Sequence, residues 1–159
     1  MGAVQLQRFD AARLPELMRW FPDADACRVW GGPSFRFPFT LESFRLDTRM
    51  DSLSTWGLMH GETLAGFGQY YLRAGRCHLG RLAIAPALRG RGLGGTLVRE
   101  LCRASSADLG IATYSLFVLP GNERAIRLYE RLGFEPARYP EAEPAFDDCI
   151  YMVAESLRT

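Results

Sequence analysis

The sequence contains no lysine, only two histidines and no long apolar run. All 19 basic residues are arginine, and 18 acidic residues almost balance them, so the formal net charge is +1. A chain without a basic excess is not expected to bind nucleic acid or a membrane surface by general electrostatic attraction. No apolar stretch is long enough to span a bilayer, and residues 1–8 lack the pattern of a signal peptide. We therefore expect a cytoplasmic protein with neither nucleic acid nor membrane as a partner.

The cysteines lack a metal-binding or disulfide pattern. Cys27, Cys77, Cys102 and Cys149 are scattered, with no CxxC pair and no cluster of histidines. We expect reduced thiols and no metal site. The chain has 159 residues, of which 48% are hydrophobic and 23% charged, as in an ordinary globular protein. This length and composition predict one domain over residues 1–159.

Periodicity and turn residues predict the order of elements. The N-terminal part is predicted to contain, in order, a strand at 4–8, a helix at 11–21, an irregular aromatic segment at 21–39 and a helix from Thr40. Three strands joined by tight turns are expected next, at 54–60, 64–73 and 76–85. The remainder is predicted to contain a helix from Leu93, a strand at 113–119, a helix at 122–132 and strands near 134–138 and 149–155. An antiparallel meander followed by a β-α-β crossover indicates an α/β or α+β fold.

A short glycine-rich segment, Arg89-Gly-Arg-Gly-Leu-Gly94, lies between a predicted strand and a predicted helix. Backbone N–H groups at a helix N-terminus can bind phosphate, and glycines allow a close approach. The segment does not match a P-loop, which needs a lysine, nor the spacing of a dinucleotide-binding loop. The residues alone leave two interpretations open, an anion-binding loop and a glycine-rich turn with exposed arginines.

Two motifs together resemble the GCN5-related N-acetyltransferase (GNAT) superfamily. The first is Leu82-Ala-Ile-Ala-Pro-Ala-Leu-Arg-Gly-Arg-Gly-Leu-Gly94, which contains the superfamily pattern Gln/Arg-x-x-Gly-x-Gly/Ala at Arg89–Gly94. The second is Asn122-Glu-Arg-Ala-Ile-Arg-Leu-Tyr-Glu-Arg-Leu-Gly-Phe134, which matches Asn-x-x-Ala-x-x-Leu-Tyr-x-x-x-Gly-Phe at every fixed position. The resemblance implies a mixed, mostly antiparallel central sheet flanked by helices.

The resemblance also implies an N-acetyltransferase that uses acetyl-CoA as donor and a primary amine as acceptor. Residues 62–138 would form the donor-binding core, and residues 20–50 would form the acceptor side. A backbone N–H near Leu82 would stabilise the oxyanion formed from the thioester carbonyl. The residues that the resemblance assigns to acetyl-CoA are Leu82, Ala83, Ile84, Arg89, Gly90, Arg91, Gly92, Leu93, Gly94, Gly95, Thr96, Asn122, Ala125 and Tyr129.

Two side chains are candidates for proton transfer. Tyr129 is the expected general acid, protonating the departing thiolate of CoA; the alternative is a core tyrosine beside Ala125 and Leu128. His78 is the candidate base, because many members carry a glutamate near this place and this chain does not; the alternative is a structural histidine. No cysteine has an evident histidine partner, so we expect direct attack by the amine in a ternary complex.

The acceptor cannot be read from the motifs, and it can be a small molecule, a peptide N-terminus or a protein lysine. Candidate acceptor-binding residues are the aromatic side chains Trp30, Phe35, Phe37, Phe39 and Tyr70, with Gln69 beside the last. The alternative is that the aromatic residues of the 21–39 segment form a small additional core. Charged candidates are Asp23, Asp25 and Glu42 for an ammonium group, and Arg81, Arg99 and Arg103 for CoA phosphates.

Other interpretations of the whole chain remain open. A non-catalytic CoA-binding or sensor domain is the alternative to an enzyme, and a nucleotide-binding module is a further one. Monomer and homodimer are both compatible with the sequence. The acidic segment at 139–148 is expected to form a loop over the cleft or at a dimer contact.

Overall fold

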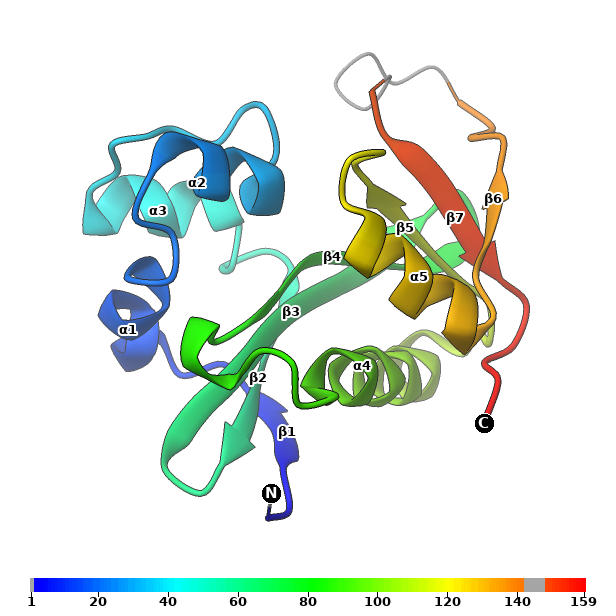
Figure 1. The fold of residues 1–159 in the computed structure, drawn as a ribbon, viewed down its shortest axis with the longest axis horizontal. Helices are drawn as coiled ribbons and strands as arrows, with labels where there is room; N and C mark the ends of the chain where they lie inside the picture. Colours follow the sequence, from blue (N-terminus) through cyan, green and yellow to red (C-terminus); the bar gives the residue numbers. More distant parts are fainter. Residues whose placement is uncertain (1, 142–147) are drawn as a thin grey trace.

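The computed structural model describes residues 2–141 and 148–159, and its centre is one seven-stranded sheet (Figure 1). The strand order is β1-β2-β3-β4-β5-β7-β6. The strands are β1 (Gln5–Arg8), β2 (Ser54–His60), β3 (Thr63–Arg73), β4 (Arg76–Ile84), β5 (Tyr114–Val118), β6 (Glu135–Ala137) and β7 (Ile150–Ala154). Neighbouring strands are antiparallel except for β4 and β5, which run parallel. The predicted strands and the mostly antiparallel sheet are confirmed.

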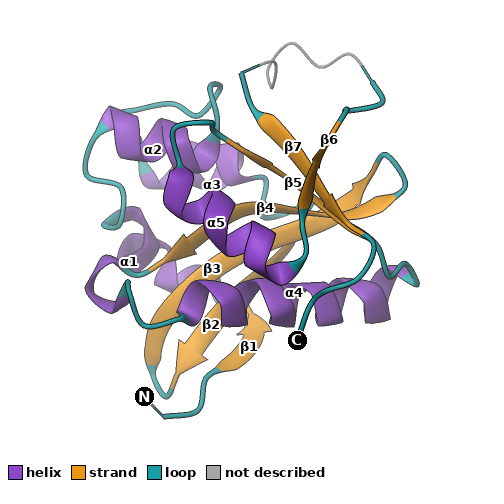
Figure 2. Ribbon diagram, turned by 45° about the vertical axis from the view of Figure 1, so that its right-hand side comes forward, coloured by secondary structure: helices purple, strands orange, loops and turns teal. Residues whose placement is uncertain are grey.

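The helices fall into two groups (Figure 1). They are α1 (Leu14–Met18), α2 (Ala24–Gly31), α3 (Leu41–Thr48), α4 (Leu93–Leu109) and α5 (Glu123–Leu132). Helices α1, α2 and α3 cover one cluster of buried side chains, which includes Phe44 and Phe67. Helices α4 and α5 cover a second cluster, which includes Leu97 and Leu116. Helix α4 packs along β3 and β4 (Figure 2).

The N-terminal helices differ from their predictions. Instead of a helix over 11–21, a 3₁₀ turn at Ala11–Arg13 precedes the short helix α1. The segment at 21–39 was expected to be irregular, but it contains α2. Asp23 begins this helix by accepting a hydrogen bond from the backbone N–H of Ala26 at 2.8 Å. The prediction was wrong because it rested on the proline and glycine content of the segment and did not recognise Asp23 as a helix cap.

A bulge in β4 separates this strand from β5. The antiparallel register pairs Gln69 with Gly80 but Phe67 with Ala83, so two residues of β4, Arg81 and Leu82, face Gly68 alone. Arg81 has a φ of 50°, in the left-handed region that residues with a side chain seldom adopt. The parallel pairing of β4 with β5 covers only residues 77–79 and 114–116. Beyond the bulge the two strands diverge, and a gap opens between them.

Among the described residues, no helix is both long enough and apolar enough to cross a membrane.

Candidate active site

An open cleft of about 1140 Å³ lies where β4 and β5 diverge. Its floor is formed by residues of β4 and β5 on either side of the gap, including Leu82–Ile84 and residues 116–119. One wall is the segment at 20–33, which contains α2. The opposite wall is the glycine-rich loop with the first turn of α4, together with α5. The cleft therefore joins the two regions that the sequence assigned to the donor and to the acceptor.

The first turn of α4 has the properties of an anion site. Gly92 is the N-cap, with a left-handed φ of 79°, and no side chain caps the helix. The first N–H groups of a helix have no partner within the helix, and the macrodipole makes this end positive. The guanidinium groups of Arg89 and Arg124 line the cleft beside it. Phosphate oxygens would satisfy both the backbone donors and the arginines.

The glycines of this segment have different roles. Gly90 and Gly92 have φ of 80° and 79°, which a residue with a side chain adopts only at a cost. Gly94 instead allows close packing of helices, because a Cβ there would lie 3.0 Å from Leu128 Cδ2 of α5. The loop thus approaches the cleft through its backbone, and α5 closes over α4.

Most of the predicted donor-binding residues line the cleft. These are Leu82, Ala83, Ile84, Arg89, Gly90, Gly92, Leu93, Gly94, Gly95, Asn122, Ala125 and Tyr129. Two do not line it in this structure, namely Arg91, which is exposed, and Thr96, whose hydroxyl donates to the Gly92 carbonyl at 3.4 Å. Asn122 caps α5 by accepting a hydrogen bond from the Ala125 N–H at 3.4 Å.

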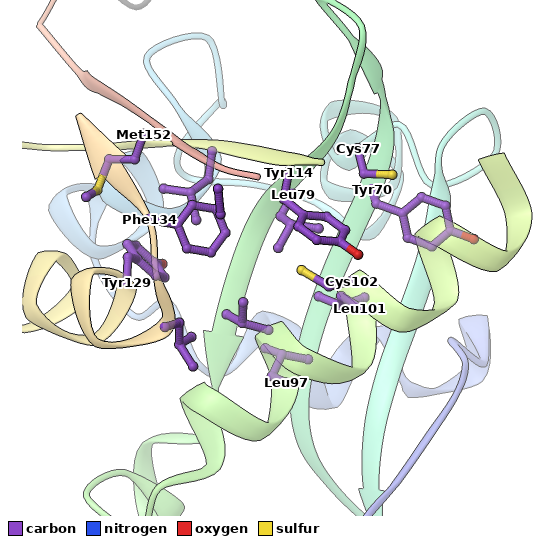
Figure 3. Close-up of a cluster of buried hydrophobic side chains, with 14 of the residues drawn as sticks. Tyr70, Cys77, Leu79, Leu97, Leu101, Cys102, Tyr114, Tyr129, Phe134 and Met152 are labelled. Atoms are coloured by element: carbon purple, nitrogen blue, oxygen red, sulfur yellow. The ribbon is translucent and has the colours of Figure 1, made fainter. Parts of the chain in front are cut away.

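Tyr129 places its hydroxyl at the cleft. The residue lies on the buried side of α5, against Phe134 (Figure 3). Its Oη makes no hydrogen bond to a described residue. Among the described residues, the buried side-chain atoms without a hydrogen-bond partner are Arg76 Nη1 and Arg81 Nε, so Tyr129 Oη is not a fully buried atom. The hydroxyl must therefore be accessible from the cleft. Burial raises the pKa of Tyr129 to about 12, so the phenol keeps its proton.

His78 also lines the cleft, but it is almost fully buried. Its Nδ1 hydrogen-bonds with Ser115 Oγ at 2.8 Å, and its ring packs against Tyr71 and Phe117. Burial, with the positive charge of Arg73 as a smaller cause, lowers the pKa of His78 to about 3. A histidine that stays neutral to this pH is a weak base. The structure therefore favours a role in ordering the cleft over the expected role as general base.

Of the aromatic residues predicted for the acceptor side, only Trp30 lines the cleft. Its ring stacks on Phe21 at 4.0 Å, and its Nε1 donates to the Arg81 carbonyl at 2.8 Å. Phe35 and Phe39 instead pack edge-on against Phe44 in the core beneath α1, α2 and α3. Phe37 lies outside the cleft and contacts Phe39. The alternative of a small additional core holds for Phe35 and Phe39, whereas Phe37 is exposed.

The prediction for Tyr70 was wrong. Its side chain belongs to the buried cluster beneath α4 (Figure 3). Its hydroxyl donates to Asp108 Oδ2 at 2.8 Å. Gln69 is fully buried and donates to the Thr48 carbonyl and to Thr55 Oγ1. The residue of β3 that lines the cleft is Tyr71. Side chains alternate along a strand, so an error of one residue moves a side chain to the opposite face.

Some of the predicted charged binding residues line the cleft and others do not. Asp25 lines the cleft, whereas Asp23 caps α2 and Glu42 lies on α3 outside the cleft. Arg99 bonds to the Arg158 carbonyl and Arg103 pairs with Glu100, both away from the cleft. Arg81 lines the cleft but extends toward Gln69 and Thr48, not toward the glycine-rich loop. The described residues contain no cluster of metal-ligating side chains, and residues 142–147 of the predicted acidic loop lie outside the described chain.

Sequence reasoning missed several cleft residues, among them Arg28, Tyr71, Arg124, Leu128 and Arg131. Arg124 and Leu128 occur within the second motif, so the helical period there could have identified them. Tyr71 depends on the register of β3, and Arg28 depends on α2, which was not predicted.

A family model described as the acetyltransferase (GNAT) family matches residues 18–134. Mycothiol acetyltransferase of Corynebacterium aurimucosum is 30% identical over 120 residues, which cover 74% of this chain and 33% of that protein. Thialysine N-epsilon-acetyltransferase of Bos taurus is 30% identical over 86 residues, or 51% of this chain and 50% of that protein. The chain therefore spans half or less of the length of these curated relatives.

Solved structures share the fold. AAC(6')-Ib in complex with ribostamycin and coenzyme A has a TM-score of 0.75 and 24% identity, covering 96% of this chain and 93% of the other. The spermidine N-acetyltransferase of Vibrio cholerae in complex with CoA and spermine has a TM-score of 0.72 and 18% identity, covering 97% and 95%. At these identities the likeness shows the fold.

Proposed function

Because the chain belongs to the acetyltransferase (GNAT) family, we propose that it transfers an acetyl group from acetyl-CoA to a primary amine in a ternary complex. The observation that carries this proposal is the cleft at the divergence of β4 and β5, with an uncapped helix N-terminus at one end and the free Tyr129 hydroxyl inside it. Acetyl-CoA supplies the acetyl group as an activated thioester.

The residues present fit the donor. Its pyrophosphate would be held by the first N–H groups of α4 and by Arg89 and Arg124. Among the described residues, no strand pairs with the β5-facing edge of β4 beyond the bulge, so its backbone groups can bind an extended chain as an added strand does. The pantetheine arm suits this place because it is extended and carries amide groups. Leu82 begins this stretch, which supports its assignment to the thioester carbonyl.

Tyr129 is the proposed proton donor. The amine nitrogen forms a bond to the thioester carbon, the carbon–sulfur bond breaks, and its electron pair leaves with the CoA sulfur. The protonated Tyr129 hydroxyl donates a hydrogen bond, and then its proton, to that sulfur; the phenolate is reprotonated from solvent. The acceptor attacks as the free amine, and the proton that its nitrogen loses on forming the amide passes to solvent; the burial that lowers the pKa of His78 argues against this residue as the base.

The test is a calorimetric titration with acetyl-CoA, with CoA, ATP and NAD as comparison ligands, followed by thiol release with a panel of amines. We expect acetyl-CoA and CoA to bind and ATP and NAD not to bind. Thiol release with an amine supports the enzyme. Binding of acetyl-CoA without thiol release for any amine would favour a non-catalytic CoA-binding domain. Binding of ATP or NAD in place of acetyl-CoA would contradict the donor assignment.

A further inference from the structure

Arg81 is a cleft-lining arginine that has no acidic partner. It lies in the β4 bulge, directly before Leu82, and its side chain passes beneath the acceptor wall of the cleft. Its Nη1 donates to Gln69 Oε1 at 3.1 Å and, at the limit of 3.5 Å, to the Thr48 carbonyl. Both acceptors are neutral. Within the described chain, no carboxylate forms an ion pair with Arg81.

The nearby carboxylate of Asp47 is already engaged. Asp47 accepts two side-chain hydrogen bonds from Arg36, at 3.0 and 2.9 Å, and a third from the Arg36 backbone N–H. Burial lowers the pKa of Arg81, and Asp47 acts only as a lesser opposing influence. Removing a cation from water without a paired anion is costly, so buried arginines normally meet a carboxylate or phosphate. Arg81 lacks such a partner.

Part of the guanidinium has no hydrogen-bond partner among the described residues. Nε is buried and has no hydrogen-bond partner. Nη2 makes no hydrogen bond to a described residue and is not among the buried unpartnered atoms, and Arg81 is one of the residues that line the cleft. A guanidinium with an accessible terminal nitrogen binds carboxylate or phosphate oxygens strongly.

Tyr71 provides a second donor on the same side of the cleft. Its hydroxyl accepts a hydrogen bond from Arg73 Nη1 at 3.1 Å, so its own proton is available for a ligand. Its ring lies over Gly80, 3.7 Å from where a Cβ would be, and it lines the cleft. Tyr71 is also close enough to Arg81 to influence the pKa of that guanidinium. The two neighbouring strands thus contribute a cation and a hydroxyl donor to the lining of the cleft.

We propose that Arg81 and Tyr71 bind a carboxylate of the acceptor, so that the preferred substrates are amines that also carry a carboxylate, such as amino acids. This inference rests on the proposed acetyl transfer and adds the acceptor class to it. The distance between the amine and the carboxylate of the preferred acceptor is set by the reach from these two side chains to the thioester.

The experiment compares matched acceptors. Amino acids with one to five carbons between amine and carboxylate are each assayed beside the corresponding primary amide, by thiol release at fixed acetyl-CoA. For the preferred length, we expect kcat/KM for the acid to exceed that for the amide by roughly 10- to 100-fold, the effect of one charge-assisted contact. The substitution Arg81→Gln should remove this preference and leave acetyl-CoA binding, measured by calorimetry, unchanged. Arg81→Lys, which keeps the charge, should restore part of it.

The control is Arg103→Gln, which removes an exposed arginine paired with Glu100 outside the cleft. This variant should keep the wild-type ratio of acid to amide. Thermal melts identify any variant that fails to fold, and the acid-to-amide ratio of the wild-type enzyme tests the inference without a substitution. If acetyl-CoA binds but no acid is preferred over its amide, the inference is wrong. If acetyl-CoA itself does not bind, the proposed function fails instead.

Discussion

Tyr129 and His78 line the same cleft, yet burial changes their chemistry in opposite ways. Burial disfavours the charged form of each group. The charged form of tyrosine is the phenolate, so the pKa of Tyr129 rises to about 12 and the residue remains a proton donor. The charged form of histidine is the cation, so the pKa of His78 falls to about 3 and the residue does not hold a proton. The same environment therefore keeps the proton on Tyr129 and keeps a proton off His78.

Replacing Tyr129 by phenylalanine tests the proton donor. We expect kcat to fall by about 100-fold or more, the usual contribution of a positioned acid, while the dissociation constant for acetyl-CoA changes little. Steady-state kinetics and calorimetry measure the two quantities. Tyr114→Phe is the matched control, because its hydroxyl hydrogen-bonds with Ser106 away from the cleft. An unchanged kcat in Tyr129→Phe would remove this residue from the mechanism.

Helix α4 packs closely against the β4 bulge at Gly68 of β3. Gly68 of β3 faces the bulge, and a Cβ there would lie 2.5 Å from Leu101 Cδ1 and 3.0 Å from Leu82 Cδ2. Leu101 belongs to α4 and Leu82 to β4. The absence of a side chain at residue 68 therefore lets α4 pack closely on the strand that diverges from β5.

The substitution Gly68→Ala should lower the free energy of unfolding by about 1–3 kcal/mol, because the added methyl group overfills this contact. Urea or guanidinium unfolding measures the change. Gly121→Ala is the control, since a Cβ there has nothing within 4 Å and its φ is not positive. A Gly68→Ala variant as stable as wild type would mean that Leu101 and Leu82 move aside without cost.

The strands of the central meander were predicted more accurately than the N-terminal helices, because their signals are local in the sequence. The three strands at 54–60, 64–73 and 76–85 were correct to within one residue, since tight turns and apolar periodicity are local signals. Helix α2 was missed because it is a short helix between prolines and glycines, and its stability comes from packing of Trp30 on Phe21 and Phe44. Such packing involves residues distant in the sequence, which no local pattern reports.

His78 links the site to the stability of the whole molecule. Its pKa in the folded chain, about 3, lies below the value of 6.5 expected when unfolded. The unfolded chain therefore binds the proton first as the pH falls. The stabilising contribution is complete above about pH 6.5 and is lost progressively toward pH 3.

The expected cost is roughly 2–3 kcal/mol of unfolding free energy at about pH 4.5 relative to pH 7, at 1.36 kcal/mol per pKa unit. Denaturant unfolding of the wild type and of His78→Gln at both pH values measures it, and the variant should lose less stability on acidification. His60→Gln, at the half-buried second histidine, serves as control and should follow the wild type. Equal losses in His78→Gln and the wild type would contradict the burial argument.

The sequence by itself determined the family, the order of the strands along the chain and the residues of the glycine-rich loop. The family and the loop can be identified from two short contiguous motifs, Arg89–Gly94 and Asn122–Phe134. The order of the strands follows from local periodicity and turn residues. Only the tertiary structure decided which side chains meet across the cleft. Side-chain alternation along β3 places Tyr71 instead of Tyr70 at the cleft. Arg81 has no acidic partner among the described residues, because the acid near it is bound by Arg36.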